Sequence, residues 1–153
     1  MLIRRGFEPC PDADPGRAVA IGNFDGVHLG HQAILAALGA RGRESRLATA
    51  VVCFEPQPKE YFARDAAPAR LMRLRDKAER IAETGVDELR VLRFNAALAG
   101  LAAEEFIERV LVRALRARQV VIGEGFRFGQ GRGGDVEILR RAGRARGFDV
   151  LAV

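Results

Sequence analysis

Residues 17–31 read RAVAIGNFDGVHLGH and join two different kinds of segment. The apolar run Ala18–Ile21 is typical of a buried β-strand. The Ala- and Leu-rich segment Leu29–Ala40 has the composition of a helix. Because a glycine-rich turn separates the two, the stretch predicts the first strand and first helix of a βαβ unit.

Strand and helix patterns alternate along the rest of the chain. Short apolar strands separated by single helices predict an α/β fold, with a five-stranded parallel sheet covered by helices on both faces. Ligands in such sheets bind beyond the carboxyl ends of the strands, near a switch in strand order. The predicted strands are Arg17–Asn23, Leu47–Phe54, Glu88–Phe94, Gln119–Gly123 and Phe148–Val153. The predicted helices are Leu29–Ala40, ended near Gly39 and Gly42, Leu71–Thr84 with Gly85 as its cap, Ala103–Ala117, and Val136–Arg146 with Asp135 as its N-cap.

Length and composition narrow the class of protein. A chain of 153 residues is about one domain. Its content of 48% hydrophobic and 29% charged residues excludes collagen-like and disordered classes. No apolar run approaches the ~20 residues of a membrane span, and the N-terminus lacks the apolar stretch of a signal peptide. Cys10 and Cys53 belong to no common motif, so we expect no disulfide framework and a reducing cytoplasm.

The net charge of +5 comes from 25 basic and 20 acidic residues. The basic residues are scattered among acidic ones along the predicted helices, and no basic stripe with interleaved aromatic residues occurs. We therefore expect no nucleic-acid partner. A moderate net positive charge is equally compatible with a small phosphorylated substrate, which it would attract.

The loop after the first predicted strand has the features of a phosphate site. Gly22 allows a tight turn out of the strand, and Gly30 permits close approach of the backbone to a ligand. His28 and His31 are three residues apart at the start of a helix, so both rings can face the same side. The N-terminus of that helix adds unsatisfied N–H groups and a partial positive charge. Two imidazoles at a helix N-terminus predict phosphate binding.

Two other interpretations compete with this one. The histidines could be capping and packing residues, or they could be a zinc pair. The chain has only two histidines, however, and both lie in the same glycine-rich loop. No cysteine or third histidine is nearby to complete a zinc site. The pattern favours charge stabilisation in phosphoryl or nucleotidyl transfer.

Two further loops at carboxyl ends of predicted strands carry aromatic residues. Prolines stiffen residues 54–62, where Phe54, Tyr61 and Phe62 could stack on a planar ring system or pack in the core. The glycine-rich loop 123–134 lacks the Gly-Lys-Ser/Thr of a Walker A motif. It carries aromatic and basic side chains that a plain linker does not need. Phe128 could stack on a ring there, and Arg127 or Arg132 could meet a phosphate.

The first of these three loops carries a resemblance to a known superfamily. Its pattern G-x-F-D-G-V-H-x-G-H resembles the HxGH signature of the nucleotidyltransferases, a group of adenylyl- and cytidylyltransferases with a Rossmann-like fold. The form Phe24–Val27 is similar to that of the bacterial bifunctional riboflavin kinase/FMN adenylyltransferases, also called FAD synthetases. The F-E-P-x-P stretch at Phe54 and the F-R-F-G-x-G-R-x-G-D run at Phe126 extend this resemblance over essentially the whole chain.

The resemblance implies transfer of the adenylyl group of ATP to FMN, giving FAD and pyrophosphate. His28 and His31 would be the catalytic residues, binding and neutralising the triphosphate. Mg²⁺ would bridge phosphates with few protein ligands, and we assign it none. Asp25 is expected to brace the loop rather than perform chemistry. The residues expected at ATP and its phosphates are Gly22, Asn23, Phe24, Asp25, Gly30, Arg127 and Arg132. The residues expected at the flavin are Phe62, Phe106, Gly125 and Phe128.

The chain departs from the family pattern in two places. Gly125 stands where the family usually has Asn or Asp, which puts one hydrogen bond to ligand in doubt. The family module also continues past the fifth strand into a phosphate-contacting Ser/Thr-rich segment and a β-barrel riboflavin kinase domain. This chain ends at Val153. We therefore expect residues 1–153 to be the adenylyltransferase domain alone, without kinase activity and without part of its phosphate clamp. Transfer to another phosphorylated acceptor, and nucleotide or flavin binding without turnover, remain open.

Overall fold

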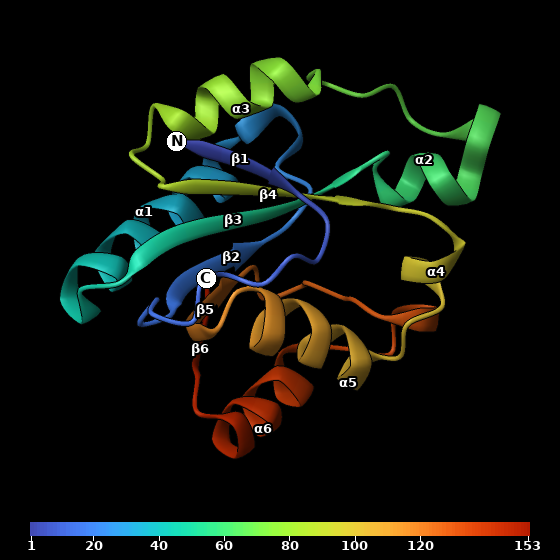
Figure 1. The fold of residues 1–153 in the computed structure, drawn as a ribbon. Coiled ribbons are helices and arrows are strands. Elements are labelled where there is room, and N and C mark those ends of the chain that lie inside the picture. The colour runs from blue at the N-terminus through green and yellow to red at the C-terminus, as the bar shows by residue number, and fades with distance from the viewer.

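A computed structural model describes all residues from Met1 to Val153. Its centre is a single sheet of six strands in the order β1-β4-β3-β2-β5-β6 (Figure 1). Every neighbouring pair of strands is parallel. The strands are β1 (Leu2–Arg5), β2 (Arg17–Ile21), β3 (Ala48–Glu55), β4 (Glu88–Arg93), β5 (Ala117–Ile122) and β6 (Asp149–Ala152). The helices are α1 (Leu29–Ser45), α2 (Pro58–Ala63), α3 (Leu74–Ala82), α4 (Ala96–Ala99), α5 (Ala103–Phe106), the π-helical continuation η3 (Ile107–Ala114) and α6 (Val136–Arg146), with short 3-10 turns η1 (Asp25–Val27), η2 (Arg64–Ala66) and η4 (Gln130–Arg132).

The structure confirms the predicted α/β class and parallel sheet, but the predicted number of five strands is wrong. The additional strand, β1, pairs with β4 at one edge of the sheet. Its sequence is only Leu-Ile-Arg-Arg, and both Leu2 and Ile3 are half exposed. A short strand with little burial lacks the apolar run by which a strand is recognised in a sequence. β1 is identified only by its pairing with β4.

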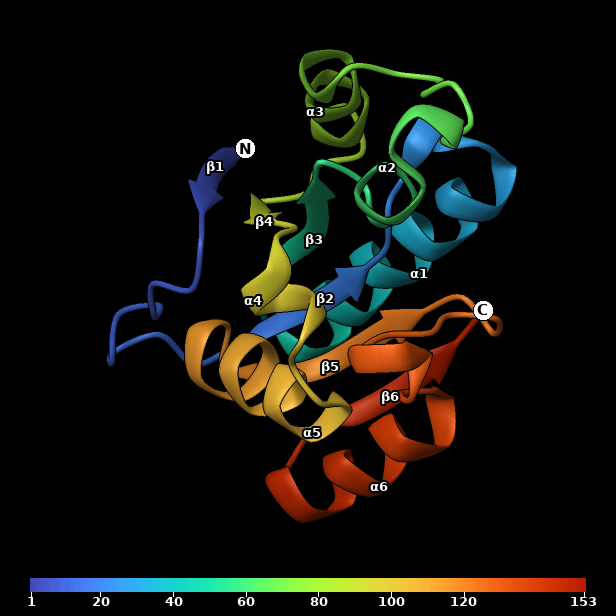
Figure 2. The same ribbon diagram turned by 90° about the vertical axis from the view of Figure 1, so that its right-hand side faces the viewer.

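Helices cover both faces of the sheet (Figure 2). On β2, alternate side chains enter different cores because successive residues of a strand point to opposite faces. Val19 and Ile21 pack in a core that includes side chains of η3 and α6. Ala18 and Ala20 pack in a second core with side chains of α1 and α3. The prediction of helices on both faces is confirmed.

The predicted end of the first helix is wrong, whereas the predicted N-cap of the last one is confirmed. α1 continues past Gly42 to Ser45. A Cβ atom on Gly42 would lie 2.5 Å from the side chain of Thr49, so this glycine allows the helix to approach β3 instead of ending the helix. At α6, the backbone N–H of Ile138 donates to Asp135 Oδ1 over 2.9 Å, as a capping aspartate should accept.

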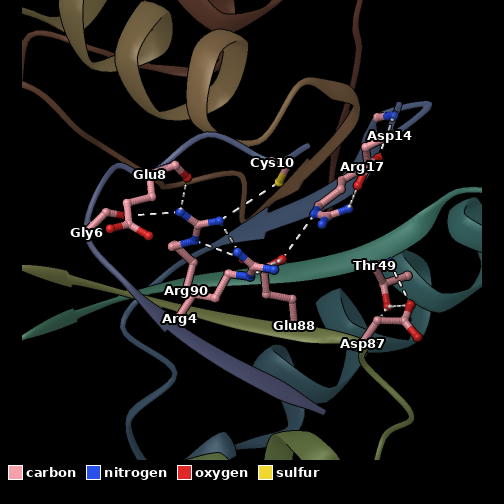
Figure 3. A network of polar contacts seen from close by, with 11 residues as sticks. Arg4, Gly6, Glu8, Cys10, Asp14, Arg17, Thr49, Asp87, Glu88 and Arg90 are labelled. Carbon is pink, nitrogen blue, oxygen red and sulfur yellow. Dashed lines mark hydrogen bonds and ion pairs between the residues drawn. The ribbon is translucent and has the colours of Figure 1, made fainter. Parts of the chain in front are cut away.

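A buried charge network ties the N-terminal segment to the sheet (Figure 3). The carboxylate of Glu88 accepts from Arg17 Nε at 3.1 Å and from Arg90 Nε at 2.8 Å. Arg90 also donates to the backbone carbonyls of Gly6 and Glu8. The network therefore holds the connection between β1 and β2 against β4.

No helix of the protein is both long enough and apolar enough to cross a membrane.

Candidate active site at the carboxyl edge of the sheet

The strand order creates a switch point between β2 and β5. From β2 the chain proceeds to β3 and β4 on one side, whereas β5 and β6 lie on the other. The loops that leave the carboxyl ends of β2 and β5 therefore diverge, and such a divergence leaves a crevice for a ligand. Both loops are the ones that sequence patterns assign to phosphate and ring binding.

The two histidines form one stacked block at the start of α1. His28 is the N-cap residue, and its Nδ1 accepts from the backbone N–H of His31 over 3.4 Å. The two ring centroids are 3.6 Å apart, and the rings are inclined by 21°. The ring of Phe24 packs 5.1 Å from that of His31. This arrangement places two imidazoles and the first N–H groups of a 17-residue helix together, as the sequence predicts.

The turn between β2 and α1 has an unusual backbone that other contacts hold in place. Phe24 and Val27 both have positive φ values, 51° and 42°, in a region that side chains other than glycine rarely adopt. The carboxylate of Asp25 accepts from the backbone N–H groups of Leu71 and Met72 at 3.0 and 3.1 Å. Asp25 thus joins this turn to the segment before α3, and its contact with a phosphate stays a prediction.

The environment of His31 lowers its pKa to about 4. Burial is the largest cause, followed by the positive charges of His28 and Lys77, while Asp25 acts in the opposite direction. The imidazole of His31 is therefore neutral near pH 7 in the free protein. It offers a hydrogen-bonding group there, and a permanent charge at this site has to come from another residue.

This pKa predicts acid sensitivity of the fold. Between pH 6.5 and about 4, the unfolded chain protonates His31 while the folded chain does not. Protonation then favours the unfolded state, so stability is lost as the pH falls through this window. We expect His31 to account for a loss of roughly 1–3 kcal/mol in the free energy of unfolding. Urea denaturation at pH 7 and pH 4.5 measures it. His31→Asn should lose less stability than the wild type over that interval, and an equal loss would contradict the assignment.

Sequence patterns missed Lys77, whose ammonium group contacts the backbone of the histidine loop at Asn23. Its side chain is fully buried, and its Nζ donates to the backbone carbonyl of Asn23 over 2.7 Å. The sequence does distinguish Lys77 from the other basic residues, because it is one of only two lysines among 25 of them. It also occupies a position of α3 that shares the buried face of Ala78 and Ile81.

A cavity of about 760 Å³ opens beside this turn. Asn23 lines it and also belongs to the histidine loop, so the phosphate site and the cavity are contiguous. The structure brings all four predicted flavin residues into its wall, together with both predicted arginines. The lining residues are Asn23, Phe54, Pro58, Lys59, Phe62, Ala63, Pro68, Phe94, Leu98, Ala99, Phe106, Gly125, Phe126, Arg127, Phe128, Gly129, Gly131 and Arg132.

Aromatic rings form much of the cavity wall. Phe106 and Phe128 are buried, with ring centroids 5.5 Å apart, and Phe126 stacks on Phe128 at 5.7 Å. Phe62 is 68% exposed, and its ring packs edge-on against the ring of Phe94, with the two centroids 5.6 Å apart. Phe94, which sequence patterns did not single out, directly follows β4 at the carboxyl edge of the sheet. The wall thus offers planar apolar surfaces with room for a ring system.

An ion-pair clamp holds the α2 side of the cavity. Arg70 donates to Glu55 at the end of β3 and to Glu60 in α2, each at 2.6 Å. The hydrogen bond from Arg70 is the main reason that the pKa of Glu60 is lowered. Because Phe62 belongs to the same short helix as Glu60, the clamp positions this aromatic wall.

The remaining predicted residues differ in what they can offer. The side chain of Phe24 is completely buried, so only its backbone is available to a ligand. A Cβ atom on Gly22 would lie 3.2 Å from the ring of Phe24, and a Cβ atom on Gly30 would lie 3.2 Å from the ring of His28. A Cβ atom on Gly125 would meet nothing within 4 Å, so the cavity has space for a larger side chain at this position. Arg127 is half exposed and lies 3.5 Å from Asp135.

Comparisons with known proteins identify the family of this chain. A family model described as FAD synthetase matches residues 10–153. The chain is 50% identical over 153 residues to the bifunctional riboflavin kinase/FMN adenylyltransferase of Escherichia coli, and the match covers 99% of this chain and 49% of that protein. The protein of the same name from Pseudomonas fluorescens is 45% identical over 152 residues, with 99% and 49% covered. The chain spans about half the length of these curated relatives.

One solved structure shares the fold over the whole chain. It is described as a macrolide-efflux protein from Streptococcus pneumoniae, and it superposes with a TM-score of 0.82 over 100% of this chain and 50% of that one. The sequence identity is 24%, so this likeness concerns the fold alone. The family model, by contrast, spans the histidine loop, the cavity wall and nearly all of the sheet. The chain belongs to the FAD synthetase family.

Proposed function

We propose that residues 1–153 form an FMN adenylyltransferase domain of the nucleotidyltransferase type. It would transfer the adenylyl group of ATP to FMN, giving FAD and pyrophosphate. The observation that carries the proposal is the shared position of Asn23. This residue belongs to the histidine loop and also lines the aromatic cavity, so a nucleoside triphosphate and a flavin would meet there. Membership of the FAD synthetase family supports the same reaction.

Each substrate has a complementary part of the site. The triphosphate of ATP would lie over His28, His31 and the N-terminus of α1, where N–H groups and the helix dipole favour anions. The isoalloxazine ring of FMN would stack in the aromatic cavity, with Phe106 and Phe128 in its wall. A volume of about 760 Å³ lies within the usual range for sites of small ligands and cofactors.

The chemistry requires positioning and charge stabilisation more than a protein nucleophile. The FMN phosphate is already anionic and would attack the α-phosphorus of ATP in line. Negative charge then develops on the departing pyrophosphate, where hydrogen-bond donors and cations lower the barrier. His28 and His31 would donate to these oxygens, and Arg127 or Arg132 would meet a phosphate at the cavity mouth.

We propose that Mg²⁺ accompanies ATP. No three His, Cys, Asp or Glu side chains are grouped to hold a metal ion, whereas phosphate oxygens are the ligands that Mg²⁺ prefers. Bound in this way, Mg²⁺ would neutralise part of the triphosphate charge. Cys10 and Cys53 are buried free thiols, which supports the reducing cytoplasm as the proposed compartment.

The experiment is to incubate the chain with FMN, ATP and Mg²⁺ and to separate the flavins by chromatography. We expect FAD to accumulate in proportion to enzyme and only when both substrates are present. A phosphorylated acceptor without a flat ring, such as ribose 5-phosphate, should give no adenylylated product. Binding of both ATP and FMN without FAD would indicate a module that binds without turnover. Binding of neither substrate would refute the proposed function.

A further inference from the structure

Lys77 is a completely buried basic residue at the edge of the proposed phosphate site. An ammonium group has three N–H donors, and one of those of Lys77 is used by the carbonyl of Asn23. That acceptor is neutral, so burial of the charge is only partly compensated within the protein. An anion bound nearby would supply the missing compensation, and the residues next to Lys77 are those of the phosphate site.

The surroundings of Lys77 define what its charge can influence. Its positive charge lowers the pKa of His31 in α1, of Cys53 in β3 and of Glu60 in α2. Of these groups, Cys53 is fully buried, and Glu60 is already engaged by Arg70. His31 is the one that faces the proposed ATP phosphates.

We propose that Lys77 is a positioning residue for adenylyl transfer, which fixes the Asn23 carbonyl and brings a positive charge to the loop that carries His31. This inference rests on the proposed function. Because water is excluded around Lys77, its field acts at higher strength than that of a solvated surface lysine. The neutral imidazole of His31 would then donate to the triphosphate while Lys77 balances the charge from behind the loop.

Three variants separate the charge from the hydrogen bond. Lys77→Gln keeps a donor for the Asn23 carbonyl but removes the charge, and Lys77→Arg keeps the charge. Arg75→Gln removes the same charge from a side chain of α3 that is 87% exposed, which makes it a matched control. We expect Lys77→Gln to raise the KM for ATP roughly tenfold or more, with the KM for FMN changed less than threefold. Arg75→Gln should remain within twofold of the wild type. Equal kinetics for Lys77→Gln and Arg75→Gln would overturn the proposal.

A second readout needs no substrate. The pKa of His31 is measured by NMR titration of its ring protons in each folded variant. We expect it to rise measurably above its wild-type value of about 4 in Lys77→Gln, while burial and His28 still hold it below the ordinary value, and to stay unchanged in Arg75→Gln. If the wild type makes no FAD, the proposed function fails, but this titration still tests Lys77. An unchanged His31 pKa in Lys77→Gln would overturn the inference.

If that variant does not fold, Lys77→Arg decides: its His31 pKa should stay low, and a return to the ordinary range would overturn the proposal.

Discussion

Replacing His31 with asparagine will lower the rate of FAD formation by about 100- to 1000-fold, the usual effect of removing one donor that stabilises transition-state charge. The rest of the site should persist, because the Phe24 ring and the start of α1 are held by other contacts. We expect the free energy of unfolding at pH 7 to change by less than about 1 kcal/mol. Initial rates with FMN and ATP measure the first effect, and urea denaturation measures the second.

His28→Asn should have a comparable kinetic effect. Asparagine is among the preferred N-cap residues, so it can replace the acceptor that His28 Nδ1 provides at the start of α1. Glu44→Gln serves as the control, because its exposed side chain lies near the other end of the same helix. If His31→Asn unfolds the protein while the remaining folded fraction keeps full activity, the role assigned to His31 is refuted.

The largest effect on stability is expected from Glu88→Ala. This substitution removes the carboxylate that both Arg17 and Arg90 contact; Arg17 keeps its ion pair with Asp14 at 2.6 Å, whereas Arg90 loses its only carboxylate partner. The side chains are 9% and 1% exposed, so water cannot replace the lost partner fully. Breaking a buried ion pair in this way costs about 3–5 kcal/mol. Urea denaturation followed by circular dichroism measures the loss.

An exposed ion pair provides the comparison for Glu88. Glu137 pairs with Arg140 on the surface of α6, and Glu137→Ala should change the free energy of unfolding by less than about 0.5 kcal/mol. Glu88 is the first residue of β4, at the sheet edge opposite the candidate active site. The KM values of folded Glu88→Ala should therefore stay near those of the wild type. A loss of stability below 1 kcal/mol would mean that the network of Figure 3 contributes little to the fold.

Local patterns in the sequence were sufficient for most of the central sheet. Four of the five predicted strands are half or more buried and flanked by helices, so their apolar runs stand out. The sequence also placed His28 and His31 on one side of a helix start, because three-residue spacing controls that geometry directly. The stacked rings in the structure confirm this relation.

The positions at which helices begin depend on contacts between residues outside the local sequence pattern. The helix predicted from Leu71 begins only at Leu74, and the backbone N–H groups of Leu71 and Met72 instead donate to Asp25. The loop expected after β3 contains the helix α2, whose N-terminus is held by Gln57 and Glu60 in a capping box.

Local sequence patterns were enough to predict the α/β class, the parallel arrangement and the loop with the paired histidines, since each depends on residues close together in the chain. Long-range packing, in contrast, brings β1 into the sheet, Phe94 into the cavity wall and Lys77 to the carbonyl of Asn23. Lys77 and Asn23 are 54 positions apart in the chain. Such a contact exists only after strand pairing and helix packing have brought α3 to the histidine loop, because its stabilisation depends on the burial that the complete fold creates.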